Sequence, residues 1–410
     1  MTGSAASIPS ERLAATTLEL LAHDTTNPPG DTRAIVDWMD AMLTDAGIGT
    51  ERVAVDDRKP NLLAAVPGAT DRRLLLSGHL DTVPYDADGW SFDPLGERVG
   101  ERIYGRGTTD MKGAVAAMLE VARYYAESDR QPPVTLAFAF VNDEEVAGDA
   151  GITALLDDGR LDADGCVIGE PTCTGSSPSI TVADRGSIWL TLESTGEAAH
   201  GSRPMLGDNA IDRLWTAIAD IRQRLAEREL PVPSDVEPIV AESVEYYADS
   251  MGRSIAERLF QYPTVNLGTI EGGESINSVP RTGRARLDVR LTAGVETSAV
   301  LAEIRGWIEN HEHVTVADVS WSVGSFESTD STLVTAVGDA AESVLDERVY
   351  RRSATGGGDA KRLREAGIPT VEFAVATDTA HACDEYTTVD ALTATAETYL
   401  SLPSAYVARI

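Results

Sequence analysis

Three short apolar runs, each followed closely by a histidine or by acidic residues, place the strongest constraint on the fold of this chain. The runs and the residues behind them are 74–76 with His79 and Asp81, 134–141 with Glu144 and Glu145, and 166–168 with Glu170. Short apolar runs between polar helical segments are typical of buried parallel strands, and open α/β sheets place their sites at the carboxyl ends of such strands. We therefore expect an α/β fold in which three strand ends bring these side chains to one edge of a sheet.

A further carboxylate is predicted at the start of a helix. Asp110 precedes the alanine-rich segment 114–125, whose composition favours a helix. Each of these short motifs alone is more often an ordinary loop, turn or surface pair. Their combination in this order, with His381 near the end of the chain, indicates a metal site.

The segments around these residues resemble the signature of one family of metallohydrolases. They are 77–84 (SGHLDTVP), 105–113 (GRGTTDMKG), 143–145 (DEE), 169–172 (GEPT) and 381–385 (HACDE). This M20-type family includes acetylornithine deacetylase, succinyl-diaminopimelate desuccinylase, aminoacylase and carboxypeptidase G. The resemblance extends over nearly the whole chain. It implies a zinc-exopeptidase-like domain, in which helices flank a mixed central sheet, and an inserted α+β lid and dimerisation domain of the ferredoxin-like type.

The resemblance also implies a ligand set for two divalent metal ions. In it, Asp110 bridges the ions, His79 and Glu170 bind one of them, and Glu145 and His381 bind the other. Imidazole and carboxylate ligands suit zinc, and also cobalt or manganese. Zinc is the default expectation.

Two more residues are expected to act beside these ligands. Asp81 lies two residues from His79, which fits a carboxylate that fixes the imidazole tautomer; a turn residue is its alternative role. By the resemblance, Glu144 takes the proton from a metal-bridging water and passes it to the leaving nitrogen, the general acid and base role of a positioned carboxylate.

Five residues are expected to contact the substrate. By the resemblance, His200 does so across a dimer interface, Asn277 belongs to the family's asparagine motif, and Arg290 grips a substrate carboxylate. Gly357 and Gly358 precede a predicted helix and would offer backbone N–H groups. Without the resemblance, His200 would be a surface residue, Arg290 a surface ion pair and the glycines a flexible loop.

The middle of the chain is predicted to be an insertion with a β-α-β-β-α-β order. The expected strands are 188–193, 264–270, 284–291 and 314–320, and the expected helices are 209–228 and 298–310. Because the proposed metal ligands lie on both sides, we expect a catalytic domain over 1–184 and 326–410 and a lid and dimerisation domain over 185–325. Residues 229–262 are open between a loop and additional helices.

The charge balance excludes several classes of partner. There are 34 basic against 66 acidic residues, a net charge of -32, and such a surface repels nucleic acid and anionic membranes. No apolar run is long enough to cross a membrane, and the N-terminus lacks the features of a signal peptide, so we expect a cytoplasmic protein. The acids are spread along the chain, which favours a halophile's protein over an acidic disordered tail.

These expectations combine into one function. The chain is predicted to be a homodimeric two-metal amidohydrolase that removes an acyl group from a small N-acyl amino acid, of the acetylornithine deacetylase or succinyl-diaminopimelate desuccinylase type. A carboxypeptidase or dipeptidase of the same family is the main alternative. A homologue that binds metal or ligand without hydrolysis is a third, which the presence of Glu144, Asp110 and both ligand histidines argues against.

Overall fold

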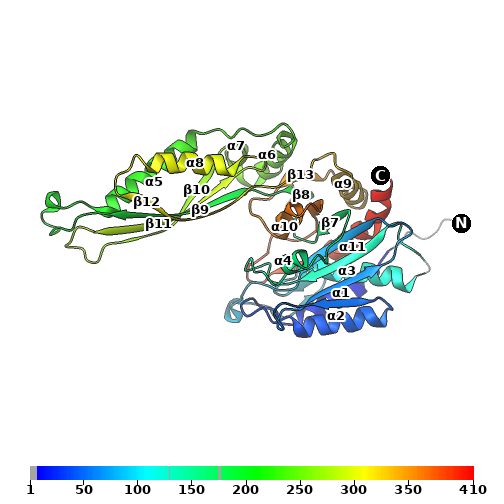
Figure 1. Cartoon of the computed structure of the whole chain (residues 1–410). Helices are drawn as coiled ribbons and strands as arrows, with labels where there is room; N and C mark the ends of the chain where they lie inside the picture. Colours follow the sequence, from blue (N-terminus) through cyan, green and yellow to red (C-terminus); the bar gives the residue numbers. More distant parts are fainter. Residues whose placement is uncertain (1–6, 129, 174–176) are drawn as a thin grey trace. The chain divides into compact units, whose positions relative to one another are not determined.

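The chain divides into two compact units in the computed structural model, which describes residues 7–128, 130–173 and 177–410 (Figure 1). The first unit runs up to Val182 and then takes in Glu327–Arg352 and Gly358–Ile410. The second unit comprises Ala183–Phe326 together with the short segment Ser353–Gly357. The second unit is therefore inserted into the sequence of the first.

The first unit is built around a mixed eight-stranded sheet with the order β1-β2-β6-β3-β7-β14-β8-β13. Its strands are β1 Thr50–Val53, β2 Asn61–Val66, β3 Arg73–His79, β6 Thr135–Val141, β7 Gly165–Ile168, β8 Ser179–Ala183, β13 Tyr350–Ser353 and β14 Thr370–Glu372. Strands β6, β3, β7 and β14 are parallel neighbours, whereas β1, β2 and β8 pair antiparallel. The central strands β3 and β6 are almost continuously buried, as parallel strands covered on both faces are.

Helices flank this sheet, which confirms the predicted fold class. They are α1 Ser10–Leu21, α2 Arg33–Asp45, α3 Lys112–Glu127, α4 Ile152–Asp157, α9 Thr332–Leu345, α10 Asp359–Glu365 and α11 Val389–Val407, with a short 3-10 turn at Ala87–Gly89. Helix α3 packs against β2, β3 and β6 and also contacts α1 and α11. Its alanine-rich sequence allows this close packing, and twelve of its sixteen residues are buried. A separate small sheet has the order β15-β5-β4, formed by Tyr386–Thr388, Arg102–Tyr104 and Glu97–Val99.

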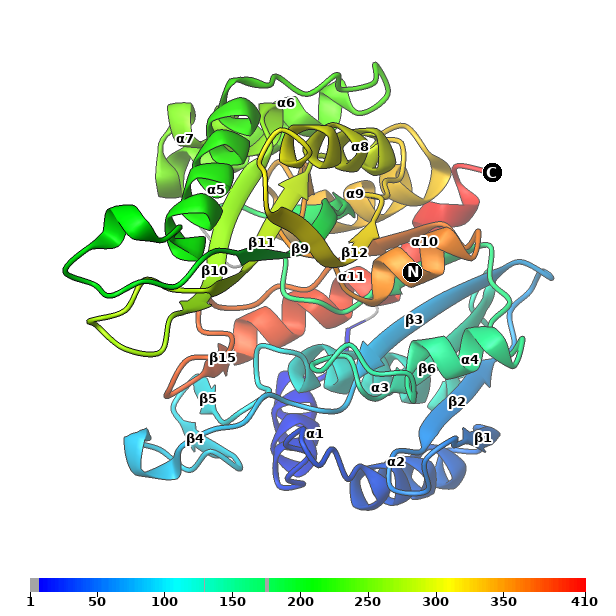
Figure 2. The same ribbon diagram turned by 60° about the vertical axis from the view of Figure 1, so that its left-hand side comes forward.

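The second unit is a four-stranded antiparallel sheet with helices on one face (Figures 1 and 2). The strands are β9 Gly186–Thr195, β10 Thr264–Gly272, β11 Thr282–Leu291 and β12 Val314–Ser322, in the order β10-β11-β9-β12, and the covering helices are α5 Ala210–Glu227 and α8 Thr297–Ile308. A 3-10 turn lies at Pro204–Leu206. This β-α-β-β-α-β order agrees with the one predicted from the sequence.

Alternation along the strands of the second unit separates its core from its surface. Ile188, Leu190 and Leu192 of β9 point into the core with the apolar face of α5, while Trp189 between them is 57% exposed. This is the period of two expected for a strand covered on one face.

Residues 229–262, which the sequence left open, contain two helices. These are α6 Glu237–Met251 and α7 Arg253–Gln261, joined at Gly252, whose φ of 85° suits glycine. Pro238 lies in the first turn of α6, where its missing N–H costs nothing.

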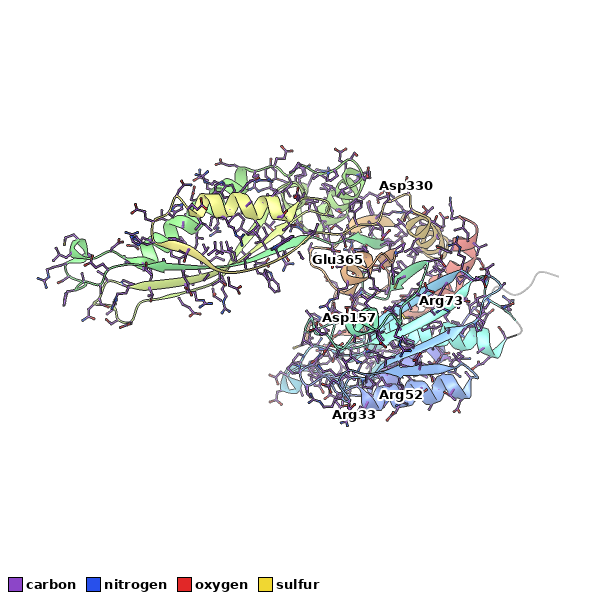
Figure 3. All side chains as sticks on the ribbon, viewed as in Figure 1. Arg33, Arg52, Arg73, Asp157, Asp330 and Glu365 are labelled. Atoms are coloured by element: carbon purple, nitrogen blue, oxygen red, sulfur yellow. The ribbon has the colours of Figure 1, made fainter. Side chains whose placement is uncertain are left out.

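Many surface arginines are paired with the abundant acidic residues. Arg52 contacts Asp37 and Asp40 of α2, and Arg33 contacts Asp31. Figure 3 draws the side chains and labels both arginines. Within the described part of the chain, no helix has both the length and the apolar character needed to span a bilayer.

Candidate metal centre

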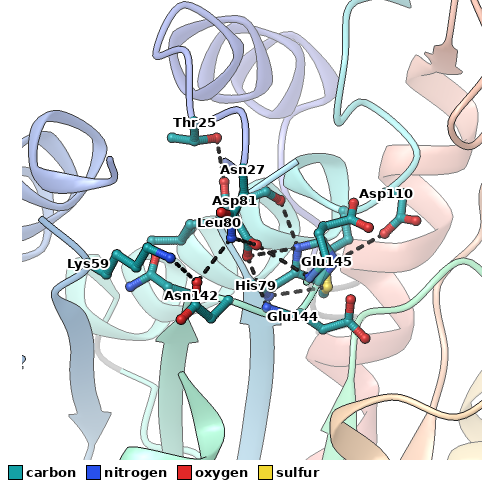
Figure 4. A network of polar contacts seen from close by, with 12 residues as sticks. Thr25, Asn27, Lys59, His79, Leu80, Asp81, Asp110, Asn142, Glu144 and Glu145 are labelled. Atoms are coloured by element: carbon teal, nitrogen blue, oxygen red, sulfur yellow. Dashed lines mark hydrogen bonds and ion pairs between the residues drawn. The ribbon is translucent and has the colours of Figure 1, made fainter. Parts of the chain in front are cut away.

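Three neighbouring parallel strands deliver residues to one edge of the large sheet. His79 is the last residue of β3, Glu144 and Glu145 follow β6, and Glu170 follows β7. Because β6, β3 and β7 are adjacent and parallel, their carboxyl ends meet, as the sequence predicted. Figure 4 shows His79, Asp110, Glu144 and Glu145 close together. Asp110 lies just before α3 and joins this group.

Asp110 lies between two histidines. Its Oδ1 is 3.1 Å from His79 Nε2, and its Oδ2 is 3.1 Å from His381 Nε2. Burial alone would raise the pKa of Asp110, but hydrogen bonds from His381 and His79 outweigh it and hold that pKa well below its usual range. The carboxylate is therefore ionised and presents one oxygen toward each imidazole.

A glutamate approaches the same Nε2 atom of each imidazole that Asp110 faces. Glu170 Oε1 is 3.6 Å from His79 Nε2, and Glu145 Oε2 is 3.3 Å from His381 Nε2. Hydrogen bonds that His381 donates to the carboxylates of Asp110 and Glu145 raise the pKa of His381 to about 10. The five residues proposed as metal ligands thus form one cluster in the first unit, arranged in two halves about Asp110.

Asp81 supports this cluster through its backbone and its side chain. The imidazole Nδ1 of His79 lies 2.9 Å from the backbone carbonyl of Asp81 and 3.7 Å from its carboxylate. The carbonyl, rather than the carboxylate expected from the sequence, is thus the hydrogen-bond acceptor, and Nε2 is left to face Asp110. The Asp81 carboxylate instead accepts from the backbone N–H groups of Glu144 and Glu145, both at 3.3 Å, and from Asn27 at 2.9 Å.

Glu144 lies in a confined position beside the cluster. Burial raises the pKa of its carboxyl to about 8, and the charges of Asp359 and Asp110 act in the same direction. Gly358 approaches it closely, since a Cβ at this position would lie 2.7 Å from Glu144 Oε1. A carboxyl with this pKa can both accept and donate a proton near neutral pH.

The residues of this cluster fit divalent metal ions. Glu145 Oε1 is buried and has no hydrogen-bond partner, which is costly for a carboxylate unless a cation is there. Single ligand atoms of His79, Asp110 and Glu145 lie within 4.8 Å of one another, and the same holds for His79, Glu144 and Glu170. Nitrogen and oxygen donors of this kind suit zinc, cobalt and manganese.

The second unit carries four of the predicted substrate residues, His200, Asn277, Arg290 and Gly357. His200 and Asn277 are neighbours, because His200 forms a β-bridge with Ser278 and the backbone N–H of Gly201 donates to the Asn277 carbonyl at 2.6 Å. Arg290 is not with them.

Arg290 lies near the other end of β11, where its guanidinium donates to both carboxylate oxygens of Asp288 at 2.7 and 3.0 Å. Of the two predicted glycines, Gly357 belongs to the second unit and Gly358 to the first. The substrate roles of all five residues stay predictions.

Some residues that contact the cluster received no role from the sequence. Arg106 and Glu385 lie within the quoted motifs and form a buried ion pair next to Asp110 and His381. Asn27 comes from a loop far away in sequence and donates to both Asp81 and Asp143. The motifs gave a signal for the first two, whereas nothing local marks Asn27.

Most of the chain is similar in sequence to known proteins of one family. A family model described as Peptidase family M20/M25/M40 matches residues 75–405. A succinyl-diaminopimelate desuccinylase of Novosphingobium aromaticivorans is 30% identical over 371 residues, which cover 86% of this chain and 88% of that protein.

Solved structures also match closely in fold. The M20 family metallo-carboxypeptidase Sso-CP2 from Sulfolobus solfataricus superposes with a TM-score of 0.78 at 19% identity, covering 96% of this chain and 99% of that one. The aminopeptidase PepT from Bacillus cereus gives 0.75 at 23% identity, covering 98% and 99%. At these identities, the two structures are evidence for the fold alone.

Proposed function

Since the chain belongs to the M20/M25/M40 peptidase family of hydrolases, we propose that it is a two-metal amidohydrolase that removes an acyl group from the nitrogen of a small N-acyl amino acid. The observation that carries the proposal is the position of Asp110, whose two oxygens each face the Nε2 atom of a different histidine, and each Nε2 atom is also approached by a glutamate. This arrangement supports two ion sites that share one carboxylate.

The proposed ligands are His79 and Glu170 for one ion, Glu145 and His381 for the other, and Asp110 for both. Two divalent ions held there would polarise the scissile carbonyl and make a water molecule a stronger acid. Zinc is the first choice for the donor set, and cobalt or manganese also suit it.

Glu144 is the proposed general base and acid. It takes a proton from the attacking water and gives it to the leaving nitrogen, which a pKa near neutrality favours. Asp81 positions it, because the Asp81 carboxylate accepts hydrogen bonds from the backbone N–H groups of Glu144 and Glu145.

The substrate class rests on the curated relative. That relative is named succinyl-diaminopimelate desuccinylase, and its 30% identity over 88% of its length supports acyl removal from an amino acid by this chain. We propose that Arg290 exchanges Asp288 for the substrate carboxylate, and that Gly357 and Gly358 offer backbone N–H groups. His200 and Asn277 would reach the substrate from the partner subunit of a homodimer.

The environment of the protein is proposed from its charge. A net charge of -32 supports a protein of a cytoplasm that contains multimolar salt, where screening removes much of the self-repulsion.

The decisive experiment is amine release from a panel of N-succinyl, N-acetyl and dipeptide substrates, in multimolar KCl with zinc or cobalt and with a chelated control. Chelator-sensitive release from succinyl-diaminopimelate or acetylornithine supports the proposal. No turnover by a metal-loaded protein on any of these substrates contradicts it.

A peptidase of the same family is the second candidate. The matching family model, which is described as a peptidase family, favours it, although the relative at 30% identity is named as a desuccinylase. Cleavage of dipeptides alone in the same panel would establish it.

A further inference from the structure

His381 is the proposed ligand with the least local support. Its side chain is 52% exposed, and its backbone is left-handed with a φ of 63°. It also lies between β14 and β15, outside every helix and strand. A non-glycine residue holds this conformation only when its surroundings fix it. Contacts from elsewhere in the first unit must therefore hold the segment in place.

A buried ion pair supplies such contacts. Arg106 is 5% exposed and Glu385 is fully buried, and Arg106 Nη1 lies 2.5 Å from Glu385 Oε2. The second terminal nitrogen of Arg106 donates to the backbone carbonyl of His381 at 3.3 Å. The guanidinium also lies over the ring of Trp90, with its carbon 5.4 Å from the ring centre. Arg106 therefore has little freedom to move away from His381.

The same ion pair reaches the shared ligand from the other side. Glu385 Oε1 accepts from the backbone N–H groups of Thr109 at 2.9 Å and Asp110 at 3.1 Å. The backbone carbonyl of Glu385 accepts from the N–H of Gly105 at 2.9 Å. One carboxylate thus ties the segment that carries Asp110 to the segment that carries His381.

We propose that the Arg106–Glu385 pair is a positioning element that sets how tightly the ion between Asp110, Glu145 and His381 is held. This inference rests on the two-metal function proposed above. The other ion depends on the pair less, because His79 ends the central strand β3 and is only 2% exposed. Disturbing the pair should therefore weaken one ion selectively.

The test is a competition titration of the full chain with a chromogenic zinc chelator, comparing the wild type with Glu385→Gln. Glutamine keeps the shape and an oxygen for the two backbone N–H groups, but it turns an NH₂ group toward Arg106. We expect one of the two zinc equivalents to bind about 10- to 100-fold more weakly, as is typical when a residue that orients a ligand is lost. The other equivalent should keep its affinity.

Glu120→Gln is the matched control. Glu120 is another fully buried carboxylate of the first unit, and it bonds to Arg12, Arg123 and Thr16 rather than to the proposed ligands. This variant should lower the melting temperature without separating the two zinc affinities.

Arg106→Lys is a second variant, needed if Glu385→Gln fails to fold. It keeps a positive charge beside Glu385 and removes the donor to the His381 carbonyl. The affinity for the same zinc equivalent should fall.

Three results would overturn the inference. Unchanged affinity for both ions in folded Glu385→Gln and Arg106→Lys leaves the two-metal function standing and removes the positioning role. If Glu385→Gln lowers the affinity for both ions equally, and Glu120→Gln does the same, the effect is one of general stability and the positioning role fails. A wild-type chain that takes up no zinc refutes the two-metal function and the positioning role together.

Discussion

Asp81 accepts a hydrogen bond from the imidazole of His79 with its backbone carbonyl, at 2.9 Å, and keeps its carboxylate for other partners. The carboxylate holds the backbone of Glu144 and Glu145 at 3.3 Å each. A substitution of the Asp81 side chain therefore removes the support of Glu144 and Glu145 but keeps the contact to His79, which the backbone carbonyl makes.

Asp81→Asn should lower kcat more than it lowers the metal content, because His79 keeps its acceptor and only the backbone of Glu144 and Glu145 loses support. An amide has one oxygen instead of two to accept from the turn that carries Glu144, so Glu144 is displaced while His79 keeps its tautomer. We expect a fall of about 10- to 100-fold in kcat, the range for lost support of a site residue. Steady-state kinetics and metal analysis by mass spectrometry provide the measurement, and loss of bound metal without a kinetic effect would contradict this account.

Glu144→Gln should lower kcat by about 10²- to 10⁴-fold, the contribution typical of a positioned general acid or base. The two metal equivalents should remain, because Glu144 is not among the proposed ligands. Glu145→Gln is the adjacent comparison and should lose one equivalent. If Glu144→Gln retained full turnover, another group would have to carry the proton.

Gly358→Ala should impair the proton transfer by Glu144, because the added methyl group crowds the Glu144 carboxylate. The new Cβ would lie 2.7 Å from Glu144 Oε1, so the carboxylate must move. A misplacement of about 1 Å can cost about 10²-fold in rate, and we expect kcat to fall toward that limit. Gly356→Ala is the matched control, since nothing lies within 4 Å of its Cβ position. Equal kcat values for the two variants would show that Glu144 tolerates displacement.

Metal removal should make stability sensitive to alkaline pH. Hydrogen bonds that His381 donates to the carboxylates of Asp110 and Glu145 raise the pKa of His381 from 6.5 to about 10. A group raised in this way stabilises the fold fully below about pH 6.5, and the contribution is lost as the pH rises through about 10. Chelated wild-type protein should therefore lose more melting temperature between pH 7 and 10 than chelated His381→Asn. If the melting temperatures of the two proteins fell equally between pH 7 and 10, protonated His381 would not be stabilising the fold.

Low salt should destabilise the whole chain. At a net charge of -32, self-repulsion is weakened when the screening length falls from about 10 Å at 0.1 M salt to about 3 Å at 1 M. The melting temperature should rise steeply with KCl, followed by circular dichroism. A melting temperature that is independent of salt would contradict the halophilic interpretation.

The sequence predicted the parts of the site that local chemistry marks. Apolar runs that end in His79, Glu145 and Glu170 have the pattern of parallel strands, and β3, β6 and β7 are indeed neighbours. The β-α-β-β-α-β order of the second unit was also readable, because its strands alternate with period two.

What the sequence did not predict depends on which distant segments meet. Asn27 reaches Asp81 from a loop near the N-terminus, and no local pattern distinguishes it from other loop asparagines. Glu385 was visible only as part of a motif, since its bonds to Thr109 and Asp110 exist only once the chain has folded. The acceptor for His79 was assigned to the wrong oxygen of Asp81 because composition says nothing about backbone geometry.

The parallel strands also limit how far the proposed metal ligands can move when the ion changes. His79 is the last residue of β3, and the backbone hydrogen bonds that hold adjacent strands about 4.8 Å apart fix its position, whereas Glu145 and Glu170 follow the ends of β6 and β7. His381 has no such support from a strand, because it lies on an irregular segment between β14 and β15. An exchange of zinc for a wider ion such as manganese would therefore be accommodated by displacement of that segment, while the sheet keeps its dimensions.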